Sequence, residues 1–199
     1  MNSKSIALTA VFAAVAIALN AVKIPTIYWP GWYYTACEIP VVIAFLLFGF
    51  KIGVLVEILH IAGQILLFPV GLATFAGYPP GLVAILLMFL GVYLASRVLV
   101  RKTASEKPLD MKKATIYLTA FAIAFRGSLM PLFDYGVSYH VLFPLFLQTS
   151  IPETYIAALV PGFILYNVTV PLYTVPIAYV VATKVSRALK IEPRFPKQA

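Results

Sequence analysis

Polar side chains that can carry or transfer protons stand inside apolar stretches of this sequence. Glu57, His60 and Gln64 follow one another at spacings of three and four residues. On a helix, these spacings place the three side chains on one face. A carboxylate beside an imidazole can act as an acid–base pair, and the same groups can line a ligand cavity or bridge two helices through hydrogen bonds. The residue types leave all three roles open.

Further charged and polar residues interrupt two later apolar stretches. Arg126 and Asp134 lie eight residues apart, and Tyr166 and Asn167 follow near the end of the chain. A charged group within the hydrocarbon of a membrane is expensive unless it faces a partner or a water-filled cavity. We therefore predict a structural ion pair between Arg126 and Glu57, and we assign Asp134, Tyr166 and Asn167 to the polar walls of a ligand cavity.

Known catalytic patterns are missing from the sequence. It contains no G-x-S-x-G, no H-E-x-x-H and no phosphate-binding G-x-x-x-x-G-K-[ST]. The single cysteine, Cys37, excludes an internal disulfide and a cysteine-based zinc cluster. We predict that the chain is not an enzyme, has no metal or cofactor, and does not itself hydrolyse ATP through a P-loop. An embedded enzyme that uses Glu57 and His60 is the weakest alternative.

The composition indicates the class of protein. Of the 199 residues, 62% are hydrophobic and 11% are charged, whereas ordinary soluble domains are about half apolar and about a quarter charged. A membrane helix needs roughly 20 apolar residues. We predict an all-α membrane protein, a single integral membrane domain over residues 1–199, with six transmembrane helices. The predicted spans are about 4–22, 36–50, 52–68, 80–99, 113–133 and 159–188.

The basic residues predict the orientation. If the N- and C-termini are both cytoplasmic, 13 of the 15 lysines and arginines lie on the inner side, and Lys23 and Arg126 are the exceptions. This bias agrees with the positive-inside rule. The net charge of +8 is then a topology signal that faces anionic lipid headgroups, and we predict no nucleic-acid partner.

Aromatic residues are concentrated in the predicted outer connections, residues 23–35, 69–79 and 134–158. Such residues can form an interfacial belt. They can also cover a flat ligand by stacking, and we favour an aromatic lid made largely by residues 28–35, next to Glu38. The predicted substrate-binding residues are Trp32, Tyr33, Tyr34, Glu38, His60, Gln64, Asp134, Tyr135, Tyr166 and Asn167.

A strip of small residues marks the first span, where Ala10, Ala14 and Ala18 recur every four residues. Such strips let helices approach closely, either within the chain or in a partner. Together with six spans and the stretch "EIPVVIAFLLFGFKIGVLVEILH" (38–60), this strip resembles the S components of energy-coupling factor (ECF) transporters, and most of all their riboflavin-specific branch. The acid-Ile-Pro start, the glycines of the turn and Glu57 carry the resemblance.

The resemblance implies a prokaryotic plasma-membrane protein that binds a vitamin with high affinity from outside. It also implies that Ala10 and Ala14 dock on a module of one ECF membrane subunit, the T component, and two ATPase subunits. The chain departs from the riboflavin branch at His60, Asp134, Phe163 and Tyr166, where that branch has lysine, asparagine, asparagine and lysine. Riboflavin is the predicted vitamin. The alternatives are thiamine, pyridoxine, folate or a similar vitamin, and a stand-alone ion-coupled secondary transporter.

Overall fold

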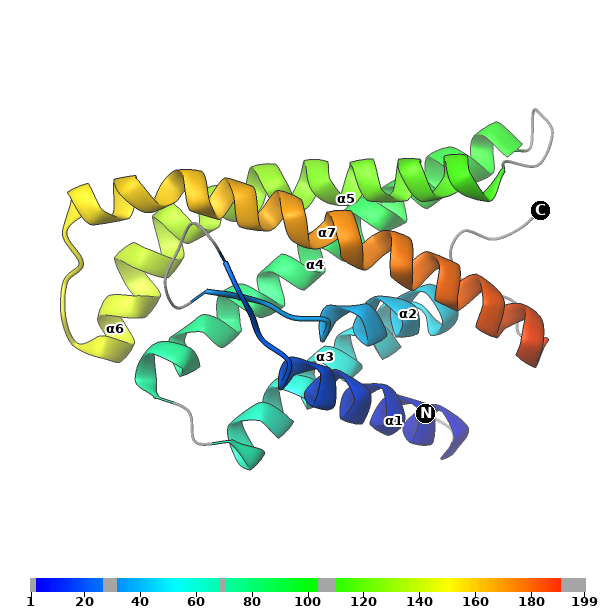
Figure 1. Cartoon of the computed structure of the whole chain (residues 1–199), viewed down its shortest axis with the longest axis horizontal. Helices are drawn as coiled ribbons and strands as arrows, with labels where there is room; N and C mark the ends of the chain where they lie inside the picture. Colours follow the sequence, from blue (N-terminus) through cyan, green and yellow to red (C-terminus); the bar gives the residue numbers. More distant parts are fainter. Residues whose placement is uncertain (1–2, 27–31, 69–70, 104–109, 191–199) are drawn as a thin grey trace.

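The computed structural model describes residues 3–26, 32–68, 71–103 and 110–190. These residues form long helices that run back and forth, with one short hairpin (Figure 1). The elements are α1 (Ser3–Asn20), β1 (Ile24–Pro25), β2 (Tyr33–Tyr34), α2 (Glu38–Phe48), α3 (Phe50–Leu67), α4 (Leu72–Thr103), α5 (Met111–Phe133), the π-helix η1 (Asp134–Leu142), α6 (Phe143–Leu147) and α7 (Glu153–Leu189). The prediction of a mostly helical fold is confirmed.

In the described ranges, four helical segments are long and apolar enough to cross a membrane: Phe50–Leu67, Thr74–Leu99, Met111–Leu147 and Glu153–Ala188. The helices at the first two predicted spans are shorter. With 11 residues, α2 is only about 16 Å long at 1.5 Å per residue, against a hydrocarbon core of about 30 Å. Six crossings therefore stay a prediction, as does the cytoplasmic position of both termini.

Two of the predicted outer connections contain helix. α4 begins at Leu72 and continues through Pro79 and Pro80, although proline removes a backbone donor from the helix. At the other connection, η1 follows α5 directly, and α6 then extends the helix to Leu147. In apolar surroundings every backbone group needs a partner, which favours continuing a helix over opening it into a loop.

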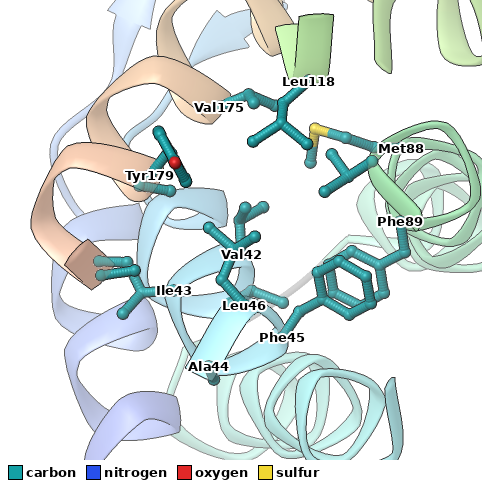
Figure 2. Close-up of a cluster of buried hydrophobic side chains, with 14 of the residues drawn as sticks. Val42, Ile43, Ala44, Phe45, Leu46, Met88, Phe89, Leu118, Val175 and Tyr179 are labelled. Atoms are coloured by element: carbon teal, nitrogen blue, oxygen red, sulfur yellow. The ribbon is translucent and has the colours of Figure 1, made fainter. Parts of the chain in front are cut away.

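The core surrounds α2, whose residues 40–47 are all buried. A helix that is apolar on every side belongs inside a bundle, which explains why this stretch has no polar face. Figure 2 shows side chains of α2 between those of α4, α5 and α7, with the rings of Phe45 and Phe89 overlapping. These two rings stack with centroids 4.2 Å apart and an interplanar angle of 8°.

Three glycines set how closely the helices approach. Gly49 joins α2 to α3 with a φ of 92°, a conformation that side chains other than glycine rarely adopt. A Cβ at Gly53 would lie 2.8 Å from the Phe45 Cβ, and one at Gly91 would lie 2.5 Å from the Phe121 carbonyl oxygen. The backbones of α4 and α5 are therefore almost in contact at Gly91.

The helix ends sort into two groups (Figure 1). The start of α1, the end of α4, the start of α5 and the end of α7 lie at one end of the molecule, and α6 lies at the other. Lys112 stands at the start of α5 and Arg187 in the last turn of α7. The end of the molecule that these helix termini share therefore carries basic residues.

Candidate ligand-binding site

A cavity of about 290 Å³ lies among the segment before α2, the first part of α4, the end of α5, η1 and α7. It is lined by Trp32, Tyr33, Glu38, Gly77, Pro80, Gly81, Ala84, Arg126, Met130, Asp134, Tyr139, Phe143, Tyr166 and Asn167. A second cavity of similar volume is lined by Phe45, Phe50, Phe89, Leu90 and Tyr93. The first combines apolar walls with charged groups, which is the composition of ligand sites.

A buried ion pair forms one polar part of this cavity. Arg126 Nη1 donates to Glu38 Oε2 at 2.5 Å and Arg126 Nη2 to Glu38 Oε1 at 3.0 Å. Arg126 is 2% exposed, and its Nε donates to Asn167 Oδ1 at 3.1 Å. The predicted pair of Arg126 with Glu57 was therefore wrong. α3, which carries Glu57, packs on α1 and α2, whereas α5 packs on α4 and α7.

Asn167 links this ion pair to a second carboxylate. Its Nδ2 lies 3.5 Å from Asp134 Oδ2 and donates to the Phe163 carbonyl oxygen at 2.9 Å. Ser138 Oγ donates to Asp134 Oδ1 at 3.0 Å. Within the described part of the chain, no lysine, arginine or histidine forms an ion pair with Asp134. The cavity wall thus carries two carboxylates and one guanidinium.

The π-helix determines which way its side chains face. Asp134, Ser138 and Tyr139 are buried, and Asp134 and Tyr139 line the cavity. Tyr135 and His140 lie outside it and both bind Glu153 at the start of α7; His140 Nε2 is 2.8 Å from Glu153 Oε2. Short π-helical segments, in which each hydrogen bond spans five residues, often occur at functional sites. Tyr135, predicted as a binding residue, instead joins η1 to α7.

Aromatic rings from the segment before α2 and from α7 form another part of the cavity lining. Trp32 stacks on Phe163 with ring centroids 5.5 Å apart and meets the Tyr166 ring edge-on at 5.3 Å. Tyr34 also stacks on Tyr166, with ring centroids 5.4 Å apart, but is not among the residues that line the cavity. The Tyr166 hydroxyl donates to the Tyr33 carbonyl oxygen at 3.2 Å. These contacts hold the segment before α2 against α7.

The predicted lid of residues 28–35 is only partly described. Residues 27–31 lie outside the described residues. On either side of them, β1 and β2 pair in antiparallel register, and the Thr26 N–H donates to the Trp32 carbonyl oxygen at 3.0 Å. The hairpin thereby positions Trp32 and Tyr33 at the cavity.

Sequence reasoning missed the wall that α4 contributes. Gly77, Gly81 and Ala84 recur at spacings of four and three residues and line the cavity together with Pro80. A Cβ added at Gly77 or Gly81 would meet no atom within 4 Å. The small-residue spacing in "GYPPGLVA" was a usable signal, but we placed residues 77–79 in an outer connection and did not consider them as part of a helix that lines the cavity. Met130 and Phe143 were also missed.

His60 and Gln64, which we predicted to line the cavity, lie elsewhere in the fold. His60 Nδ1 is 3.2 Å from Glu57 Oε2, and Gln64 Nε2 donates to the Ile17 carbonyl oxygen at 3.4 Å. All three polar side chains are buried. The helix face was predicted from its spacing, but that face meets α1 and not the cavity. Among the described residues, His60 Nε2 has no hydrogen-bonding partner.

The described part of the chain is a mostly helical fold with four segments long and apolar enough to cross a membrane, and it holds a cavity with apolar and charged walls. No family model and no curated protein matches the sequence. A solved structure does match: that of the S component of a bacterial ECF transporter, with a TM-score of 0.66 and 18% sequence identity, over 96% of this chain and 99% of the other. The chain therefore has the fold of that S component along nearly its whole length.

Proposed function

We propose that this chain is the substrate-capturing S component of an ECF-type importer and not an enzyme. The observation that carries the proposal is the shared fold over 96% of the chain. The position of the cavity supports it, because η1 and the start of α4, which contribute to its lining, lie at the end of the molecule away from the start of α5 and the end of α7 (Figure 1). Those two helix ends carry Lys112 and Arg187. In the orientation predicted by the basic residues, the cavity is near the outer membrane surface.

The ligand that we propose is a vitamin or a related small heterocycle. Stacked aromatic rings beside a few placed polar groups suit a flat ring system. Riboflavin is the vitamin favoured by the sequence resemblance and is the first to test. The cavity of about 290 Å³ lies at the lower end of ligand-site volumes, roughly 300–1,000 Å³, so compact vitamins such as thiamine and pyridoxine belong in the same test.

The proposed docking surface for the T component and its two ATPase subunits is on α1. Ala10, Ala14 and Ala18 are exposed there, whereas Ala13 and Ala16 face the core with 4% and 0% exposure. An exposed strip of alanines leaves a smooth face for close helix contact within the membrane. This surface and the cavity belong to different parts of the structure, so binding and docking can be separated by mutation.

Reconstituted uptake tests the proposal. We expect proteoliposomes that contain this chain, a T component and the ATPases to take up the vitamin only with ATP inside. Ala14→Trp should abolish uptake and leave vitamin affinity in detergent unchanged, because the bulky ring blocks α1. Ala120→Trp, at an exposed alanine on α5, is the matched control and should retain uptake. Equal loss of affinity and uptake in Ala14→Trp would contradict the division of roles.

A second candidate function is a stand-alone secondary transporter. The Glu57–His60 pair, buried in a membrane helix, favours it, since such pairs occur in proton pathways. Uptake by the chain alone, abolished by an uncoupler and by Glu57→Gln, would select this function over the importer.

A further inference from the structure

The charges around the cavity do not balance. Arg126 is occupied by Glu38 through two hydrogen bonds and by Asn167 through a third. Asp134 also lines the cavity, and in the described part of the chain no cationic side chain pairs with it. The lining therefore has a formal net charge of −1 when both carboxylates are ionised.

The Asp134 carboxylate has acceptor sites left for hydrogen bonds from a ligand. A carboxylate has about four sites that accept hydrogen bonds. Ser138 occupies one at 3.0 Å, and Asn167 approaches another at 3.5 Å. Asp134 is 8% exposed, and a buried carboxylate is costly without a cation or further donors. A ligand in the cavity that carries a positive charge or several N–H donors would supply the missing partners of the Asp134 carboxylate.

The aromatic residues of the lining are compatible with the same kind of ligand. Trp32, Tyr139 and Tyr166 line the cavity that Asp134 lines. The faces of aromatic rings carry negative potential and attract cations, most strongly where water is excluded. Anionic ligands are disfavoured by the same charges, because the guanidinium of Arg126 is already neutralised by Glu38.

We propose that this cavity selects a flat heterocycle that carries a positively charged nitrogen, with Asp134 as the residue that determines this specificity. The proposal rests on the proposed capture function and narrows its substrate class. Gly77 and Gly81 leave open space on the α4 side, where the ring of such a ligand fits against the backbone. An uncharged ring such as the flavin would leave Asp134 without a cation.

The test is a binding comparison with the purified full-length chain in detergent. The cationic probes are thiamine, pyridoxamine and 1-methylnicotinamide, whose ring nitrogen is methylated, and the neutral probes are riboflavin and nicotinamide. We expect one of the cations to bind at least about tenfold more tightly than either neutral probe. Asp134→Asn, which keeps the shape and removes the charge, should lower the affinity for that cation by about tenfold or more and leave the neutral probes unchanged.

Three controls accompany this comparison. Asp110→Asn makes the same chemical change at an exposed residue just before α5 and should bind like the wild type. Gly81→Leu, whose side chain enters open space, should weaken every probe and so locate binding in this cavity. Thermal unfolding shows whether Asp134→Asn folds. If it does not, the proposal is tested by the preference of the wild type for cationic over neutral probes, and Asp134→Glu, which retains the charge, should keep that preference.

A neutral probe that binds as tightly as every cation would overturn the proposal, as would a cation preference that survives Asp134→Asn. These outcomes leave the importer function intact if ATP-dependent uptake of a neutral vitamin is found. Failure of the function itself has another signature: no probe is taken up when the chain is reconstituted with a T component and ATPases.

Discussion

Arg126 and Glu38 meet through two parallel hydrogen bonds although they are 88 residues apart in the sequence. Such two-point pairs are stronger and more directional than single contacts. This pair connects α5 to the first residue of α2. At that position the positive N-terminal end of the helix dipole also stabilises the Glu38 carboxylate. The pair thereby fixes one wall of the cavity and neutralises the arginine within it.

We predict that Arg126→Gln lowers the free energy of unfolding by about 3–5 kcal/mol, because it leaves a largely buried carboxylate without its cation. Thermal and denaturant unfolding in detergent measure the effect. The double variant Glu38→Gln/Arg126→Gln should recover part of the loss, since neither charge is then stranded. Arg97→Gln, at an exposed residue that donates to the Tyr93 hydroxyl, should change stability by less than about 0.5 kcal/mol. Equal stability of Arg126→Gln and wild type would refute this assignment.

The close approach of α4 and α5 makes a prediction about glycine. Gly91→Ala should destabilise the protein by about 1–3 kcal/mol, because the added Cβ would overlap the Phe121 backbone, which cannot move aside easily. Gly81→Ala is the matched substitution on the same helix. Its Cβ meets open space, so stability should be unchanged or rise by up to about 1 kcal/mol. The melting temperatures of Gly91→Ala and Gly81→Ala test this prediction. A similar change in both variants would contradict a close backbone contact at Gly91.

We predict that both the ring and the hydroxyl of Tyr166 stabilise the packing of the segment before α2 on α7. Tyr166→Phe removes one hydrogen bond to the Tyr33 carbonyl oxygen and should cost about 1 kcal/mol. Tyr166→Leu also removes the contacts with Tyr34 and Trp32, each worth about 0.5–1.5 kcal/mol. Trp29→Phe removes the other tryptophan of the chain, so the remaining fluorescence reports on Trp32. In this background, the emission should shift to longer wavelength in Tyr166→Leu, because Trp32 loses a packing partner, and should stay near that of the parent in Tyr166→Phe. Identical spectra for the two variants would remove Tyr166 from the aromatic wall.

Cys37 should be a slowly reacting thiol in the folded protein. Its side chain is buried, with 7% exposure, and its Sγ lies 2.9 Å from Thr35 Oγ1. Because the thiolate is the reactive form, maleimide at pH 7 should label Cys37 at least about tenfold more slowly than the denatured chain. Met111→Cys in a Cys37→Ser background places a thiol at an exposed position and should react quickly. Fast labelling of native Cys37 would show that the segment before α2 opens.

The local features of this protein follow from composition and spacing. Long apolar stretches with few charges predict membrane helices, because a backbone in lipid must satisfy its own hydrogen bonds. The spacing of Glu57, His60 and Gln64 predicted one helix face, and the structure buries all three on α3. The aromatic segment before Glu38 predicted a ring-lined site, and Trp32 and Tyr33 do line the cavity together with Glu38.

What only the tertiary structure decided is which helix faces meet. Periodicity identifies a polar face but not its neighbour, so Glu57 was paired with Arg126 although α3 faces α1 and α5 faces α4 and α7. The helical continuation through Pro79 and Pro80 depends on the surrounding helices and brings Gly77 and Gly81 to the cavity. The sequence by itself determined membrane helices, a basic end and a set of polar and aromatic residues. The packing of α2, α4, α5 and α7 decided which of these residues share one cavity, because contacts between residues far apart in the chain depend on the shape of every helix between them.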